Sequence, residues 1–452
     1  MSISRLMTRS SAGLGVLLVA LNARADVTLV DRDGWQIYSN GRISAFLSYA
    51  NGEQIPAAGP DPNMPTRDLQ MAPGGLTLDS DAPVTDPSSH HQSLRIRSGF
   101  VGNVLGLGLR RELGDETQLQ AYTHLHAVIE PPDRRKWRVI ETDFREAYFK
   151  VENPRWGSIL LGRSLSLFSR GATEITYLYG FAYSLGVPAT VDNVGPGVGH
   201  IGFGVLAANY APGVVYTTPN LVGFRLALGL FDPNSLAGQW DRTQWARPEA
   251  ELSFDWKSNT ALVHLFANGA WQKVYQSLSP RSETVYGGGY GARIEVGPVH
   301  LGLAAHYGRG LGLSFALQPA EQITAGGPSQ NYELRTFDGY YAQFQLALRR
   351  FDINAGAGVT RVHLLASDRL DQLDDDGDPT TPASNDDGNP GSLDPRGFNN
   401  YKQQLGLSGA VVFHANDQLH FSLDYFRAQM EWYLADAKQV VHFVNAGGTF
   451  QW

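Results

Sequence analysis

The chain has 452 residues, 36 lysines and arginines against 44 aspartates and glutamates, and no cysteine. The formal net charge of −8 argues against nucleic acid as a partner, because binding to a phosphate backbone needs concentrated positive charge. The lack of cysteine excludes a disulfide framework and cysteine metal sites. After the N-terminal region no stretch reaches 18 apolar residues, so the sequence offers no candidate transmembrane helix.

Residues 1–25 have the pattern of a secretory signal peptide. Arg5 and Arg9 precede the apolar run AGLGVLLVAL at 12–21, and ARA at 23–25 has the small-x-small form of a cleavage site. The alternative is a buried N-terminal helix. Removing 1–25 deletes three arginines and no acidic residue, which changes the formal net charge from −8 to −11. We therefore expect an exported protein that is either soluble or embedded in a membrane as a closed barrel.

From residue 34 onward the dominant period is two. In WQIYSNGRISAFLSY at 35–49, Ile43 and Leu47 alternate with Arg42, Ser44 and Ser48. The same alternation recurs in SLRIRSGF, YYAQFQLALRR, NYKQQLGLSGAVVF and QLHFSLDYFR. A helix needs apolar residues three and four apart, and no long segment keeps that spacing. The pattern predicts an all-β protein whose strands have one apolar and one polar face.

The connectors between these strands alternate strictly in length. Seven are short turns: 114–117, 153–157, 218–223, 257–260, 296–298, 349–352 and 414–417. Eight are long: 51–91, 130–141, 165–210, 232–246, 276–282, 309–332, 367–399 and 434–437. Fifteen connectors join sixteen strands, and short turns on one side with long loops on the other are typical of outer-membrane barrels.

A soluble β-sandwich would explain the alternation but not the strict alternation of loop length. Aromatic residues also stand at the strand ends on the apolar register, as an interfacial girdle requires. The candidates are Trp35, Tyr49, Trp256, Trp271, Tyr307, Tyr425, Trp432 and Trp452. The chain ends on the alternating stretch HFVNAGGTFQW. We interpret this stretch as the closing strand, which pairs with the first strand and leaves the sheet without an edge.

Several stretches resemble the general porins of Gram-negative bacteria. They are IYSNGRISAFLSY, RIRSGFVGNVLGLGLRREL, REAYFKVENPRWGSILLGR and YTTPNLVGFRLALGLF, together with the aromatic C-terminus. With the closing strand they cover roughly a quarter of the chain. No single motif is specific, but each falls where the strand count places it. The resemblance implies a transmembrane antiparallel barrel of sixteen strands, residues 26–452, that forms a homotrimer.

The resemblance also implies that the third long connector, 165–210, folds into the pore and faces a ladder of basic side chains. The matching basic positions are Arg42, Arg97, Arg145 and Arg163. Arg95 and Arg225 share the polar register and are added on that ground. The alternative for each is a salt-bridged wall residue. A charge that faces lipid near the midplane costs several kcal/mol, which favours a lumen position for Arg42, Arg97 and Arg145.

The third connector departs from the family because it lacks the acidic P-E-F-G-G type motif. Its acidic residues are Glu174 and Asp192, and it contains Tyr177 and Tyr179 in an aromatic run. Carboxylates opposite an arginine wall would create a transverse field that sorts solutes. The aromatic run could line a path for sugars or aromatic solutes, or simply pack the loop on the wall. The direction of ion selectivity is left open.

Other signals are weaker. Asp374, Asp376 and Asp378 in the acidic connector 367–399 have the spacing of oxygen ligands for calcium, but the full EF-hand loop pattern is missing and a solvated external loop is the better interpretation. His124 and His126 have no serine or aspartate at a recognisable catalytic spacing. The second connector, EPPDRRKWR at 130–138, is strongly basic and is a candidate subunit latch or lipid-phosphate contact.

We therefore expect a passive diffusion porin of the Gram-negative outer membrane, without cofactor or covalent chemistry. Its expected partners are its own copies, outer-membrane lipid and lipopolysaccharide, and small hydrophilic solutes. Two alternatives stay open: a substrate-specific channel with an aromatic-lined constriction, and a barrel enzyme. An energised, plugged transporter is disfavoured, because it needs more strands and an N-terminal plug.

Overall fold

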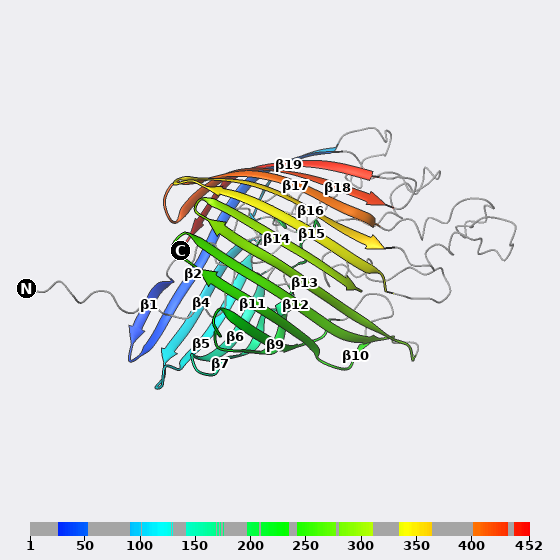
Figure 1. Ribbon diagram of the computed structural model, residues 1–452. Coiled ribbons are helices and arrows are strands. Elements are labelled where there is room, and N and C mark those ends of the chain that lie inside the picture. The colour runs from blue at the N-terminus through cyan, green and yellow to red at the C-terminus, as the bar shows by residue number, and fades with distance from the viewer. Residues whose placement is uncertain are drawn as a thin grey trace, which may run out of the picture.

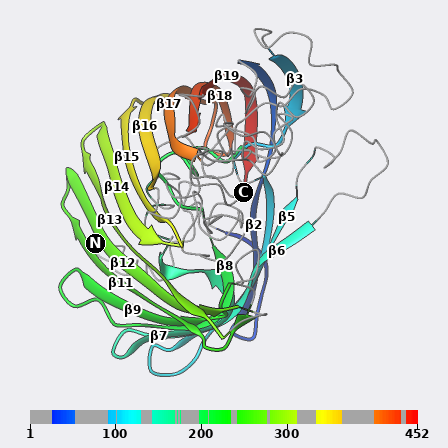
Figure 2. The ribbon, with the colours of Figure 1, turned by 90° about the vertical axis from the view of Figure 1, so that its right-hand side faces the viewer.

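The computed structural model describes residues 26–52, 91–100, 102–127, 129, 142–168, 170, 172, 175, 197–207, 209–234, 242–276, 280–310, 334–363, 401–432 and 438–452. These residues form a closed antiparallel barrel. Figure 1 shows the inclined strands of its wall from the side, and Figure 2 shows them as a ring around the interior.

The strands have the following bounds. The first half of the chain contains β1 (Val27–Arg32), β2 (Trp35–Gly52), β3 (His91–Arg97), β4 (Asn103–Glu112), β5 (Gln118–Ala127), β6 (Thr142–Asn153), β7 (Gly157–Leu165), β8 (Tyr210–Thr217) and β9 (Phe224–Phe231). The second half contains β10 (Arg242–Thr243), β11 (Arg247–Lys257), β12 (Ala261–Tyr275), β13 (Ser282–Val296), β14 (Val299–Arg309), β15 (Thr336–Ala347), β16 (Phe351–His363), β17 (Tyr401–His414), β18 (Leu419–Trp432) and β19 (Lys438–Gln451).

These elements occupy sixteen positions around the wall. β3 and β4 both pair with β2 and form one position in two segments, as do β10 and β11 beside β12. Every other neighbour pair in the wall follows chain order, and β19 pairs with β2 from Val441↔Gly52 to Gln451↔Arg42. This last pairing closes the sheet, so the predicted role of the C-terminal strand is confirmed.

All seven predicted short turns join consecutive strands, and each predicted long connector separates the strands that it was expected to separate. The sequence predicted neither β10, which lies within the predicted connector 232–246, nor β1. β1 folds back on β2 through a two-residue turn, where Asp33 and Gly34 have φ angles of 55° and 79°. β1 pairs with the part of β2 that extends past Trp452, whose backbone bonds to Gly41. β1 therefore continues the line of β19 along the edge of β2.

The two faces of the wall differ as the alternation predicts. On β2, Ile43 and Leu47 are 58% and 49% exposed, whereas Ser44 and Ser48 between them are 3% and 0% exposed. The exposed register is the outer face, because in a closed barrel only that face lacks other parts of the chain to pack against. Apolar residues outside and polar residues inside are the arrangement of a barrel that crosses a membrane rather than one with an apolar core.

The predicted aromatic residues lie on the outer face wherever their side chains are described. Tyr49, Trp256, Trp271, Tyr307 and Tyr425 are between 37% and 50% exposed. Trp35 and Trp452 are partly buried, since Arg111 lies over the Trp35 ring and Trp452 donates from Nε1 to Ser39 Oγ at 3.2 Å. Trp432 lies on β18, but its side chain is outside the described set.

Candidate channel lining

The predicted basic residues of β2 and β3 lie on the inner face. Arg42 is 7% exposed and Arg97 is 0% exposed. Arg42 donates to the carbonyl oxygens of Phe100 and Gly102, in the irregular segment between β3 and β4. That break in the strand turns two carbonyl groups toward the guanidinium. These contacts are charge-assisted hydrogen bonds that fix the guanidinium of Arg42 on the inner face.

Arg97 belongs to a polar chain across the closure of the barrel. Its Nη2 donates to Asn445 Oδ1 at 3.1 Å, and Asn445 Nδ2 donates to Asp424 Oδ1 at 2.7 Å. Arg95 lies on the same face of β3 and is partly exposed. Ordered side chains from β3, β19 and β18 thus converge on the interior, as the shared polar register predicts.

Arg145 reaches the interior by an irregular route. The pairing of β5 with β6 shifts register between His124 and Leu125, opposite Glu146 and Phe144, so that Arg145 stands at a bulge. Such a bulge re-aims side chains. The Arg145 guanidinium lies 5.9 Å from the centre of the Tyr210 ring, which in turn is 6.4 Å from the buried His126 ring on the inner face.

The prediction for Arg163 is wrong. Arg163 is exposed and pairs with Ala147 and Pro212, which are both exposed on the outer face. Ser164, its neighbour, is 6% exposed on the inner face. The alternation of β7 runs without a register shift from the outward Ile159 to Arg163, which therefore share the outer face. Arg163 is therefore not part of the lumen set.

Arg225 lies on the inner face near the short-turn end of the barrel. Its Nη1 is 2.9 Å from Asp255 Oδ2, and Asp255 Oδ1 is 2.8 Å from His264 Nδ1. Arg225 alternates with the outward-facing Phe224 and Leu226, so its side chain faces inward. The charge of Arg225 is compensated by the carboxylate of Asp255.

Carboxylates of β11 hold the start of the third long connector. The backbone N–H of Phe168 donates to Glu249 Oε2 at 2.9 Å, and Glu249 also accepts from Arg247 at 2.8 Å. Arg170 forms an ion pair with Glu251. Glu249 and Glu251 are 4% and 5% exposed, and both stand on the inner face of β11.

Further along, the connector contacts the inner face of strands that follow β11 in the wall. Ile175 is 0% exposed and packs with Phe266, Ala304 and Tyr341, from β12, β14 and β15. These three residues share the inner register of their strands.

The returning part of the same connector, 197–207, packs on β15 to β18. His200 is completely buried, with its ring 4.8 Å from the Tyr341 ring and 4.9 Å from the Phe426 ring. Its Nε2 lies 2.7 Å from Ser408 Oγ and its Nδ1 lies 3.3 Å from the Phe203 carbonyl oxygen. The carbonyl can only accept, so Nδ1 carries the proton and Nε2 accepts from Ser408. Burial lowers the pKa of His200 to about 3, which keeps the ring neutral.

Serine–histidine contact is also the start of a hydrolytic dyad, but this pair does not fit one. A nucleophile needs access to substrate, and the His200 ring is enclosed by Tyr341 and Phe426. The pair acts as an anchor for the connector. The Gly204 N–H, which donates to Thr360 Oγ1 at 2.8 Å, is a second anchor beside it.

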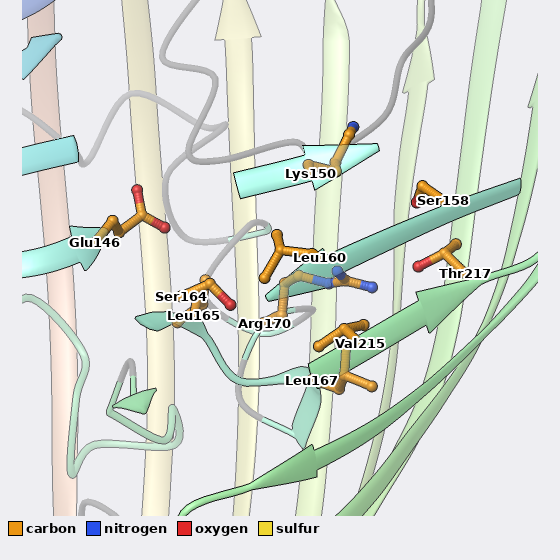
Figure 3. Close-up of a pocket in the computed structure, with 10 residues that line it drawn as sticks. All are labelled: Glu146, Lys150, Ser158, Leu160, Ser164, Leu165, Leu167, Arg170, Val215 and Thr217. Atoms are coloured by element: carbon orange, nitrogen blue, oxygen red, sulfur yellow. The ribbon is translucent and has the colours of Figure 1, made fainter. Parts of the chain in front are cut away.

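A small cavity of about 30 Å³ lies between β6, β7, β8 and the start of the connector. Figure 3 shows its lining, with Glu146 at one end of the view and Ser158 and Thr217 at the other. It has room for water but not for an organic solute. Glu146 is 0% exposed, and its Oε2 lies 3.3 Å from His124 Nδ1.

The acidic and aromatic residues predicted at the constriction, Glu174, Asp192, Tyr177 and Tyr179, lie outside the described residues. The same holds for the calcium candidates Asp374, Asp376 and Asp378 and for Arg134, Arg135 and Lys136 of the second connector. Within the ranges that the structure describes, no group of three or more His, Cys, Asp or Glu could hold a metal ion. In the same ranges, no helix is long and apolar enough to cross a membrane.

Sequence reasoning missed the carboxylates that face the connector. Glu249 and Glu251 alternate with Pro248 and Ala250 on β11, so a polar-register signal was present in the sequence. What the sequence could not show is that Arg170, 81 residues away, comes to lie beside Glu251.

Comparison with known proteins shows which fold this is. No family model matches the chain, and no curated protein matches it. Among solved structures, the outer membrane channel DcaP of Acinetobacter baumannii matches with a TM-score of 0.62 and 12% identity, covering 94% of this chain and 100% of that one. The chain has the porin fold.

Two further structures support this assignment. The anion-selective porin from Comamonas acidovorans matches with a TM-score of 0.55 and 12% identity, over 92% of this chain and 100% of that one. Salmonella typhi OmpF, in complex with daunomycin, matches with a TM-score of 0.52 and 9% identity, over 94% and 99%. The porin fold that the sequence motifs predicted is thus confirmed. It is the fold of an outer-membrane barrel, whose strands cross the membrane many times.

Proposed function

We propose that this protein is an outer-membrane porin, a water-filled channel through which small hydrophilic solutes and ions diffuse passively. The observation that carries the proposal is the distribution of polarity on a closed barrel. Ile43, Leu47 and the five outward aromatic residues face away from the interior, and Arg42, Arg97 and Asn445 face into it. An apolar outer band suits lipid, and a polar interior suits water and solutes.

The third long connector is proposed to form the constriction. Support comes from its two described parts, which both contact the inner register: Arg170 at Glu251, Ile175 at Phe266, and His200 at Ser408. These contacts lie on the adjacent strands β11 and β12 and, separately, on β17. Glu174, Asp192, Tyr177 and Tyr179 are proposed to stand on the segment between them and to face the arginines of β2, β3 and β6.

We propose a preference for anions at this level of the channel. Arg42, Arg95 and Arg97 stand together on the inner register of β2 and β3, and Arg145 reaches the interior from β6. Glu249 and Glu251 stand on β11, where each meets an arginine. A stretch of wall on which arginines gather carries a positive field, which attracts anions.

The proposed assembly is a homotrimer in contact with outer-membrane lipid and lipopolysaccharide, and it rests on the resemblance of the sequence motifs to general porins. Mass measurement of the detergent-solubilised native protein tests it. A mass of three chains is expected, and a mass of one chain would contradict the proposed assembly.

The alternative of a substrate-specific aromatic channel is less well supported. Described rings do line up on the inner face, with Tyr122 5.7 Å from Tyr148 and 6.3 Å from Tyr38. However, Tyr38 and Tyr148 are only 2% and 6% exposed, so these rings pack within the wall instead of offering an open surface. Saturable block of conductance by one solute would favour this alternative.

Single-channel recording in planar bilayers tests the proposed function. The purified full-length protein should give large, open conductance steps, with a reversal potential under a KCl gradient that indicates anion preference. An R42Q/R145Q variant should conduct and lose that preference. A folded, heat-modifiable barrel that conducts no ions would contradict the porin proposal.

A further inference from the structure

Charged and polar residues gather on the outer face of β15 to β19, which lie side by side in the wall (Figure 1). Successive cross-strand partners form one row through all five strands and therefore share one face. Asp338 begins the row, two residues from the outward Tyr340. The members of this polar row, from β15 to β19, are Asp338, Arg361, Gln403, Glu431 and Lys438. The row lies at the strand ends that lead to the long connectors, which is the external end in the proposed orientation.

The polar row stands at the far edge of the apolar band. On β16 every outward position before Arg361 is apolar, namely Phe351, Ile353, Ala355, Ala357 and Val359. From Phe351 to Arg361 the strand rises about 33 Å along its own axis and about 25 Å along the membrane normal, at a tilt of about 40°. The apolar band of an outer-membrane barrel is also about 25 Å tall. Arg361 therefore stands where hydrocarbon gives way to lipid headgroups.

The two carboxylates of the row have partners on the same face. Asp338 is 7% exposed and forms an ion pair with His363. Glu431 accepts hydrogen bonds from Gln403 Nε2 at 2.7 Å and from Gln429 Nε2. These contacts tie the acidic groups into the wall, so they do not neutralise the cations that stand beside them.

Arg361 is exposed and forms no ion pair within the described ranges. It directly faces Asp338 across the strands, but its guanidinium lies over the Tyr340 ring, 6.0 Å from the ring centre. Stacking on a ring uses the face of a guanidinium and leaves its N–H edge available to an acceptor outside the wall. The tyrosine thus holds the cation at the surface without supplying a negative charge.

Arg427 and Lys438 extend this cationic surface to β18 and β19. Arg427 Nη2 donates to a neutral acceptor, Gln429 Oε1, at 2.7 Å. Lys438 is exposed and stands opposite Glu431, yet no ion pair joins the two in the described part of the chain. Inside the barrel, in contrast, four arginines form ion pairs with carboxylates: Arg170, Arg225, Arg247 and Arg293.

We propose that Arg361, Arg427 and Lys438 form a docking surface for the phosphate groups of lipopolysaccharide in the outer leaflet of the membrane. The inference rests on the proposed orientation of the channel in the membrane and deepens its proposed contact with lipid. At the edge of the hydrocarbon a cation is partly dehydrated. A phosphate that reaches it from the headgroup layer supplies the counter-charge through charge-assisted hydrogen bonds.

The width of this docking surface favours a lipid with more than one phosphate. The three cations stand on β16, β18 and β19. At about 4.8 Å per strand they span about 15 Å across the wall, which is more than a single phosphate group can bridge. Lipopolysaccharide carries several phosphates on its sugar headgroup, whereas a phospholipid such as phosphatidylglycerol carries one.

The experiment measures binding of fluorescently labelled lipopolysaccharide to the purified full-length protein in detergent, by fluorescence anisotropy. A cation beside an anionic lipid surface contributes about fivefold in affinity, so the R361Q/R427Q/K438Q variant should bind about a hundredfold more weakly than the wild type. Dephosphorylated lipopolysaccharide should bind the wild type equally weakly. A triple variant with wild-type affinity would overturn the docking surface. An equal loss of affinity for micelles that contain phosphatidylglycerol would overturn the assignment to lipopolysaccharide.

R111Q is the matched control. Arg111 is also an outer-face cation over an aromatic ring, 5.0 Å from the centre of the Trp35 ring, but it stands at the short-turn end of the barrel. R111Q should keep the wild-type affinity, and a loss equal to that of the triple variant would contradict the proposed location. If the triple variant does not fold, R361Q alone should lose about fivefold in affinity. A wild type that conducts but does not bind lipopolysaccharide contradicts the docking surface alone, whereas one that binds it but conducts no ions contradicts the proposed channel alone.

Discussion

At the scale of single residues, Val222 is the least favourable position in the described wall. It is 95% exposed in a two-residue hairpin closed by Leu221 and Phe224, and its φ is +55°. A β-branched residue is strained in this left-handed region, where asparagine is tolerated. V222N should therefore stabilise the barrel by about 1 kcal/mol, measured as a higher urea midpoint of unfolding in detergent. V299N, at an exposed regular strand position, should give no gain, and an equal gain there would contradict the strain argument.

His200 predicts a dependence of stability on acid. Its pKa is lowered to about 3 in the folded chain and is about 6.5 when unfolded, so the unfolded chain binds more protons between these values. The contribution of His200 to stability is therefore complete above pH 6.5 and is lost progressively as pH falls toward 3. H200Q can still bond to Ser408 but does not titrate. Its melting temperature should fall less than that of the wild type between pH 7 and pH 4; equal falls would show that His200 does not contribute.

At the scale of elements, strand periodicity predicted the seven short turns and the closing strand, because the alternation of faces is a local property. Arg163 and β1 show where this reasoning ends. Arg163 was assigned from a motif, although the alternation of β7 places it on the same outer face as Ile159. β1 pairs with residues 35–39 of β2, a pairing that the alternation alone does not indicate. The anchoring of the third connector depends on Glu249 and Glu251, which stand 81 residues further along the chain than the groups that they hold.

The anchoring of that connector leads to a prediction for β11. E251Q removes the charge that holds Arg170, so the start of the connector should fluctuate more. We expect noisier single-channel currents and a moderate change in conductance, with the barrel still folded. E152Q is the control, because Glu152 forms an ion pair with Lys150 on β6 and touches no described part of the connector. Quiet E251Q currents identical to those of the wild type would contradict the anchor.

At the scale of the whole molecule, the assignment of the two faces explains both how the barrel sits in a membrane and how it conducts. Leu252 and Ser253 are neighbours on β11, and they face opposite ways: Leu252 is 48% exposed on the outer face, and Ser253 is partly buried on the inner face. An arginine on the lipid face costs about 2–4 kcal/mol near the bilayer midplane, whereas the lumen accepts one.

This contrast gives a test that one variant alone could not provide. L252R should sharply reduce the fraction of protein that folds into lipid vesicles, measured by heat-modifiable migration on gels. S253R should fold like the wild type and shift the reversal potential further toward anions, because it adds a cation beside Arg225 and Asp255 on the channel wall. Equal folding losses in both variants would mean that β11 does not separate lipid from water, and the proposed membrane channel would then fail with the polarity pattern on which it rests.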